Sequence, residues 1–180
     1  MRNRLWRTCF GAVALCMPVL VFLSGCDSPQ TLQIGDTAPP FSMREIGGRT
    51  VDLEQYRGKV VVLYFWASCC LDTLKLIEPY YEQHRQEIEV IAVNDNDAAA
   101  TAAYARSNKI TFTMLADKPM KLFNAYKAKG FPTIYIVDRS GVIREKIIGD
   151  IGLEPLEKLM TRQIGVGKKA AESYEKMLGR

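Results

Sequence analysis

The stretch that most constrains this chain runs from residue 60 to residue 81. Its first part, VVVLYFW at 60–66, is short, β-branched and aromatic, and it carries no charge. This pattern is typical of a strand that is buried on both faces of a parallel sheet. A helical pattern follows, in which apolar residues recur three and four positions apart: Leu71, Leu74, Ile77 and Tyr81. Cys69 and Cys70 lie between the two patterns, so we expect both thiols at a strand-to-helix turn.

The N-terminus has the features of a secretory signal. Three arginines precede the apolar, uncharged segment Cys9–Phe22, which is shorter than the roughly 20 residues of a membrane-spanning helix. The segment ends at Leu23-Ser24-Gly25-Cys26, which resembles a bacterial lipobox. We therefore expect residues 1–25 to be a lipoprotein signal peptide and Cys26 to carry the lipid. The alternative is an uncleaved anchor, and both interpretations place the domain outside the cytoplasm.

If residues 1–25 are removed and Cys26 carries a lipid, three properties of the mature chain follow: its location, its remaining cysteines and its net charge. We expect a lipoprotein of the cell envelope, on the periplasmic side of a bacterial membrane, with residues 26–33 as a tether. Of the five cysteines, only Cys69 and Cys70 remain in the domain, so neither has a distant partner for a structural disulfide. Removal of Arg2, Arg4 and Arg7 lowers the formal charge from +4 to +1. Nucleic-acid binding therefore has no electrostatic support.

Strand and helix patterns alternate through the rest of the chain. The length and the 48% hydrophobic content suit one globular domain with appendages, which we place at 34–164, followed by a basic tail or helix at 165–180. The tail carries four cations, and a solvated helix or frayed end is favoured there over a contact with anionic lipid. The expected elements are a hairpin at 41–53, strands at 60–66, 88–93, 111–115, 133–137 and 142–148, and helices from 71 to near 86, at 98–107, from 117–119 to 126, and at 154–163.

This order of elements, with thiols at the first strand-to-helix junction, resembles the thioredoxin fold. Three segments resemble the redoxin family more closely, and within it the TlpA/ResA-type membrane-anchored thiol-disulfide oxidoreductases: GDTAPPF at 35–41, RGKVVVLYFWAS at 57–68 and GFPT at 130–133. The resemblance implies an α/β thioredoxin-like fold, with a central mixed sheet flanked by helices and an N-terminal β extension. It also implies a cis peptide bond before Pro132 and a substrate groove formed by Trp66, Phe131, Pro132 and Thr133.

The chain departs from that family at the thiols themselves. The family carries Trp-Cys-x-x-Cys, whereas this chain has Ser68-Cys69-Cys70-Leu71-Asp72-Thr73. An alignment extended from the strand makes Cys70 the attacking cysteine and places Thr73 at the resolving position. An alignment extended back from the helix makes Cys70 the second cysteine and shortens the loop by about three residues. The sequence leaves both alignments open.

The two thiols define the expected chemistry. A thiol near a helix N-terminus has a lowered pKa, so we expect Cys70 to be the nucleophile. Adjacent Cα atoms are about 3.8 Å apart, below the usual minimum of about 4.4 Å for a disulfide. Cys69 is therefore either a partner in a strained disulfide or an apolar residue beside a monothiol site. His84 is about four helical turns away, which excludes it as a shared metal ligand, and we expect no metal and no cofactor.

Two hypotheses of different classes follow. The first is a lipid-anchored, extracytoplasmic thiol-disulfide oxidoreductase that acts on protein thiols or disulfides through Cys70 and Cys69. The second is a redox-inactive binding module or assembly factor that holds a partner in the cis-proline groove. In both, the partners are a protein with cysteine thiols or a disulfide, and a membrane that is reached through the lipid on Cys26.

Overall fold

The structure, a computed structural model, describes residues 31–67 and 72–178, and the statements below concern these residues. The expected signal peptide, the lipid site Cys26 and the two thiols Cys69 and Cys70 lie outside the described residues. No helix among those described is long and apolar enough to span a lipid bilayer.

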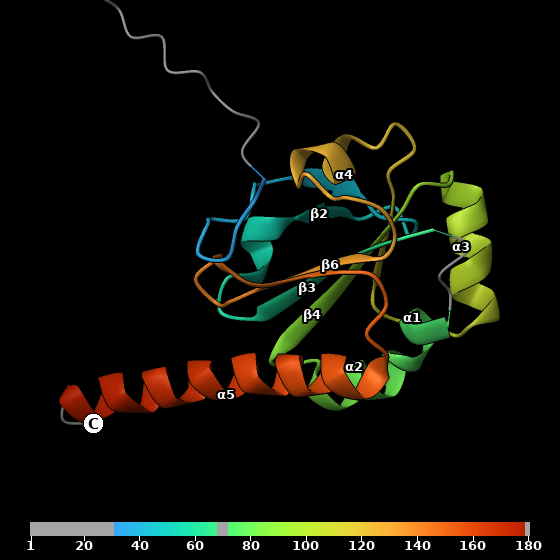
Figure 1. The fold of residues 1–180 in the computed structure, drawn as a ribbon. Helices are drawn as coiled ribbons and strands as arrows, with labels where there is room; N and C mark the ends of the chain where they lie inside the picture. Colours follow the sequence, from blue (N-terminus) through green and yellow to red (C-terminus); the bar gives the residue numbers. More distant parts are fainter. Residues whose placement is uncertain (1–30, 68–71, 179–180) are drawn as a thin grey trace, which may run out of the picture. The chain divides into compact units, whose positions relative to one another are not determined.

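The described chain is built on a five-stranded mixed sheet in the order β5-β4-β3-β6-β7 (Figure 1). The central strand β3 (Val60–Trp66) is fully buried, as its apolar sequence predicts. It runs parallel to β4 (Ile88–Asn94) and antiparallel to β6 (Thr133–Val137). The outer strands are β5 (Thr113–Ala116) and β7 (Ile143–Ile148). The predicted thioredoxin-like fold with a mixed central sheet is therefore confirmed.

Helices cover both faces of this sheet, because every residue of β3 is apolar and its side chains alternate between the faces. The even-numbered side chains of β3 pack against α1 (Asp72–Leu76), α2 (Glu78–His84), α3 (Ala98–Ser107) and α5 (Leu153–Met177). The odd-numbered ones pack against the N-terminal extension, the short 3-10 helix η1 (Leu53–Tyr56) and α4 (Lys121–Ala125). Figure 1 shows α5 and α2 on one side of the sheet and α4 on the other.

The N-terminal extension forms the predicted hairpin, with β1 (Ser42–Arg44) antiparallel to β2 (Thr50–Asp52). Through Glu45 the hairpin covers one edge of the sheet, at β5, and the segment before the hairpin reaches the other edge, beside β7. Thr37 forms a bridge with Val142 beside β7, and Glu45 forms a bridge with Leu115 of β5. A single segment therefore connects the two outer strands.

The helix that follows β3 differs from its prediction. The sequence pattern predicts one helix that ends near Gln86, whereas the structure has two helices, α1 and α2, separated at Ile77. Pro79 lies at the start of α2 and has no backbone N–H, so it cannot continue the hydrogen bonds of α1.

The start of α4 also differs. Pro119 was expected in the first turn of that helix, but α4 begins at Lys121, after Met120 in the left-handed conformation (φ 57°). The buried carboxylate of Asp117 accepts hydrogen bonds from the backbone N–H groups of Lys121 and Phe123, both at 2.9 Å. Asp117 therefore stabilises the helix from outside its first turn. The aspartate at the start of α3 behaves as predicted, because Asp97 accepts from the N–H of Ala100 at 2.9 Å.

The last helix is longer than its sequence pattern predicts. A helix at 154–163 was expected, but α5 continues without a break to Met177, through two glycines. Its first half buries Leu156, Met160 and Ile164 against the sheet. Its second half is exposed, and Figure 1 shows it extending past the end of the sheet.

Taken together, the elements of the described chain place the carboxyl ends of β3 and β4 next to α1 and the loop before β6.

Candidate functional site

The candidate site is built at the carboxyl end of β3, where the two thiols follow Trp66 in the sequence. Trp66 is 1% exposed, and its ring lies 4.6 Å from the ring of Tyr104 on α3, measured between centroids. The buried amide of Asn94, the residue paired with Trp66 on β4, donates to the Trp66 carbonyl at 3.2 Å. Its oxygen accepts from the N–H of Asn96 at 2.7 Å. Asn94 therefore fixes both the end of β3 and the loop that follows β4.

The loop before β6 lies beside this strand end. The peptide bond between Phe131 and Pro132 is cis, as predicted. Thr133 pairs with Phe65 in the sheet, and its hydroxyl donates to the carbonyl of Gly130 at 2.7 Å. Pro132 therefore immediately precedes the residue that pairs with β3 next to Trp66. The predicted contact of Pro132 with Cys70 lies outside the described residues.

The predicted groove residues occupy two faces of the sheet. The side chain of Trp66 belongs to the core beneath α3 and α5. Phe131 is half-buried on the opposite face, with its ring 4.9 Å from that of Phe123. Pro132 and Thr133 are buried. Of the four predicted groove residues, Phe131 alone has a partly exposed side chain.

The first turn of α1 has a polar anchor that sequence reasoning missed. Thr73 is 5% exposed, and its hydroxyl lies 2.8 and 2.6 Å from the two carboxylate oxygens of Asp150. Asp150 lies in the connection between β7 and α5, 77 positions away in the sequence. The sequence singled out Thr73 as the residue at the resolving position in one alignment. No local pattern indicated its partner.

The titratable groups with shifted pKa values lie away from this end of the sheet. Burial raises the pKa of Glu89, which lies near the start of β4, where the hydroxyl of Thr113 donates to it at 2.8 Å. Burial likewise raises the pKa of Tyr135 to about 12. His84 stacks on Tyr80 and lies 3.3 Å from Glu87, at the end of α2. Among residues 31–67 and 72–178, no three His, Cys, Asp or Glu side chains are arranged to hold a metal ion.

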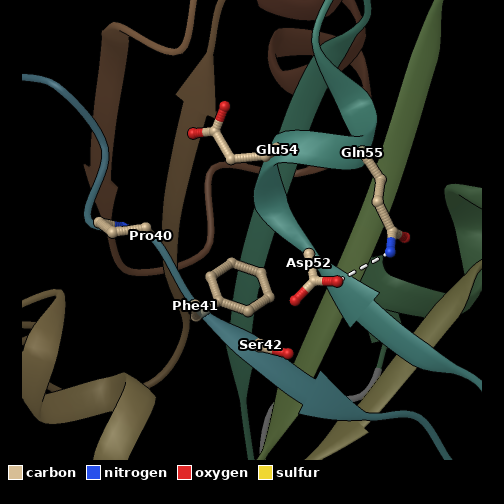
Figure 2. A pocket seen from close by; sticks show the side chains of 6 residues that line it. All are labelled: Pro40, Phe41, Ser42, Asp52, Glu54 and Gln55. Carbon is tan, nitrogen blue, oxygen red and sulfur yellow. Dashed lines mark hydrogen bonds between the residues drawn. The ribbon is translucent and has the colours of Figure 1, made fainter.

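A groove of about 700 Å³ lies elsewhere, on the N-terminal hairpin and η1 (Figure 2). Both of its carboxylates have partners, because Asp52 accepts from Gln55 at 2.9 Å and Glu54 pairs with Arg57 at 2.7 Å. Its lining contains no thiol, and the hydrogen bond from Arg57 lowers the pKa of Glu54, which does not suit a general base. It is lined by Pro40, Phe41, Ser42, Asp52, Glu54 and Gln55. The carboxyl end of β3 is therefore the better candidate for redox chemistry.

Comparison with known proteins gives the family of this chain. The model of the AhpC/TSA family matches residues 34–146. A protein named thioredoxin-like protein YneN from Bacillus subtilis is 32% identical over 135 residues, which cover 71% of this chain and 78% of the relative. The thiol-disulfide oxidoreductase ResA of Bacillus cereus is 30% identical over 133 residues, which cover 71% and 77%.

Two solved structures show the same fold. The thioredoxin domain of a thiol-disulfide oxidoreductase from Bacteroides vulgatus matches with a TM-score of 0.58 and 25% identity, over 72% of this chain and 99% of that one. A thiol:disulfide interchange protein from Chlorobium tepidum matches with a TM-score of 0.64 and 18% identity, over 73% and 98%. The second likeness concerns the fold alone.

Proposed function

The chain belongs to the AhpC/TSA family, and from this premise we propose that it is a thiol-disulfide oxidoreductase with Cys70 as its nucleophile and Cys69 as the neighbouring thiol. The observation that carries the proposal is the framework on either side of the two thiols. The end of β3 is held by Asn94, the start of α1 is held by Asp150, and the loop containing Pro132 lies beside both. Relatives with this fold and 30% to 32% identity are named ResA and thioredoxin-like YneN.

The proposed reaction is thiol-disulfide exchange. The Cys70 thiolate attacks one sulfur of a client disulfide, the client S–S bond breaks, and a mixed disulfide forms between Cys70 and the client. The second client sulfur leaves as a thiolate and takes a proton from water. A second thiolate, from Cys69 or from a small external thiol, then attacks the Cys70 sulfur in the mixed disulfide, so that a new disulfide forms on Cys70 and the client sulfur leaves as a thiolate. A further molecule of external thiol, such as dithiothreitol, reduces the disulfide on Cys70, is itself oxidised to a disulfide, and restores the Cys70 thiol. The reverse sequence oxidises a client dithiol.

The client would bind at the loop before β6. Phe131, the residue before Pro132, supplies a partly exposed apolar side chain beside the end of β3. Thr133 is already paired with both β3 and β7, and the Pro132 carbonyl accepts from the N–H of Gly149, so neither residue offers a backbone edge to the client. We propose a protein client that packs against Phe131 along this loop.

We also propose that the protein is anchored in the cell envelope by a lipid on Cys26. The lipobox-like segment at 23–26 ends the apolar stretch, and a short polar segment follows Cys26 in the sequence. Metabolic labelling with a fatty acid is expected to mark the parent and not the Cys26→Ala variant. Equal label in both proteins would remove the anchor from the proposal.

A turnover assay tests the proposed activity. The purified domain is supplied with a disulfide-bonded reporter peptide and dithiothreitol, and thiols are titrated in parallel before and after reduction. Turnover above the rate with dithiothreitol alone supports an oxidoreductase. Stable capture of the peptide without turnover would instead support the binding module, which the missing Cys-x-x-Cys pattern favours.

A further inference from the structure

The connection between β7 and α5 contacts both α1 and the loop before β6. The Thr73 hydroxyl on α1 donates to the Asp150 carboxylate, as described above. One residue earlier, the N–H of Gly149 donates to the carbonyl of Pro132 at 2.8 Å. The Asp150 carboxylate also accepts from the N–H of Gly152 at 2.8 Å, which fixes its own position. A connection of four residues, 149–152, therefore holds α1 on one side and the loop before β6 on the other.

These contacts matter because α1 has little stability of its own. It contains five residues, and a helix of that length does not persist in water without tertiary contacts. Within it, Leu74 is completely buried and fixes the side that faces the core. Leu76 is 47% exposed. The hydrogen bond from Thr73 to Asp150 is thus the polar contact that fixes the start of α1 against the rest of the molecule.

We propose that Thr73 and Asp150 form a positioning pair that sets the place of α1, and with it the thiol that precedes α1, relative to the loop at Pro132. This proposal rests on the proposed function and deepens it. In the alignment extended from the strand, Thr73 stands at the position of the family's second cysteine. Its hydroxyl donates to the Asp150 carboxylate. The position serves orientation in this protein rather than electron transfer.

The pair acts through geometry, so its loss should lower the rate of exchange more than the affinity for the client. A displacement of about 1 Å at a reacting group can lower a rate by about 100-fold. We expect Thr73→Val and Asp150→Ala each to lower kcat about tenfold, with KM for the reporter peptide changed less than about twofold. Both substitutions break the Thr73–Asp150 contact, and Asp150→Ala also removes the acceptor of the Gly152 N–H, so the double variant should be no slower than Asp150→Ala alone.

Conservative variants and a matched control separate positioning from general destabilisation. Thr73→Ser restores the hydroxyl and Asp150→Asn restores an acceptor oxygen, so both are expected to recover most of the lost rate. Glu154→Ala is the control, because it removes a carboxylate only four positions from Asp150. That carboxylate is 79% exposed and contacts Lys158 on the same helix. All variants are compared below their unfolding transitions.

Two further measurements report on the pair without turnover. Hydrogen exchange of the α1 amides should accelerate in Thr73→Val and Asp150→Ala and stay unchanged in Glu154→Ala. Alkylation of the folded protein by iodoacetamide should change rate in the same two variants. Unchanged α1 exchange in Asp150→Ala, an equal effect of Glu154→Ala, or additive losses in the double variant would overturn the proposal. A parent without turnover would instead refute the proposed function, and the exchange measurement would still decide whether the pair holds α1.

Discussion

The two ends of the central sheet both enclose polar side chains, but of different kinds. At the carboxyl end of β3 and β4, the buried side chains of Asn94 and Thr73 hold the loops around the candidate site, Asn94 by donating to the Trp66 carbonyl and Thr73 by donating to the Asp150 carboxylate. Towards the amino end of β4, the buried group is the carboxyl of Glu89, which is 6% exposed. Thr113 donates to it, and the Arg49 guanidinium and the Tyr56 hydroxyl lie 3.4 and 3.5 Å from the Thr113 hydroxyl.

This difference separates function from stability along the strands. A neutral amide or hydroxyl does not itself change charge with pH, which suits a site whose loops must stay in place. A buried carboxyl does change its charge with pH, and burial disfavours its charged form. Substitutions at the carboxyl end should therefore affect the redox site together with the stability of the loops around it, whereas substitution of Glu89 should change the pH dependence of unfolding and leave turnover nearly unchanged.

The largest expected effect is at the thiols. Cys70→Ser should lower the turnover of the reporter peptide on the order of a thousandfold or more, because it removes the proposed nucleophile. Glu89→Gln, at the other end, should leave turnover within about twofold. Steady-state rates of the parent and the two variants, measured at one concentration of the reporter peptide, are sufficient for this comparison. Parent-like turnover in Cys70→Ser, or an equal loss in Glu89→Gln, would break the division between the two ends.

The companion variant Cys69→Ser sharpens the mechanism. If an external thiol resolves the mixed disulfide, this variant should keep its turnover when dithiothreitol is present. If Cys69 resolves it, the mixed disulfide with the reporter peptide should accumulate, which mass spectrometry detects.

A smaller effect is expected from Asn94→Ala. The change leaves the Trp66 carbonyl and the Asn96 N–H without the hydrogen bonds that Asn94 provides, and each loss of this kind costs about 1 to 3 kcal/mol. We expect the free energy of unfolding to fall by about 2 to 4 kcal/mol in urea titrations. Asn108→Ala is the control, because that amide donates to the Tyr104 carbonyl near the end of α3. A fall no larger in Asn94→Ala than in the control would contradict the role assigned to Asn94.

The smallest effect is a pH-dependent one at Glu89. Burial raises its pKa, while hydrogen bonding to Thr113 and the charges of Lys59 and Arg49 lower it less. A carboxyl with a raised folded-state pKa contributes stability that is present below its unfolded value, near 4.5, and is lost as the pH rises through the folded value.

Glu89→Gln keeps an acceptor for Thr113 and removes the charge. The variant should therefore be more stable than the parent at pH 7, and the difference should disappear below pH 4.5. Urea titrations at several pH values measure it. A constant difference across that range would show that Glu89 does not titrate as its burial implies.

Local patterns predicted much of this fold. The uninterrupted apolar run at 60–66 required a buried central strand, and the structure has it as β3. The two glycines at 47 and 48 indicated the hairpin, and Asp97 indicated the start of α3, since capping depends on neighbours in the sequence.

The features that the sequence did not predict depend on contacts between distant segments. Thr73 and Asp150 are 77 positions apart, and neither residue has a neighbouring signal. The sequence pattern predicted a helix only at 154–163, and Gly165 and Gly167 beyond it each lower helix propensity by about 1 kcal/mol. Tertiary contacts outweigh this cost, because the side chains of Arg162 and Gln163 bind Glu145, and Lys168 pairs with Glu87.

The N-terminal extension also has a consequence for association between molecules. An outer strand with free N–H and C=O groups can pair with a strand of another chain and start aggregation. Here the N–H of Gly35 donates to the Ile143 carbonyl at 2.9 Å, and the N–H of Ile46 donates to the Met114 carbonyl at 3.2 Å. The residues that lead into the domain thus occupy part of both sheet edges, which protects the protein from edge-to-edge polymerisation.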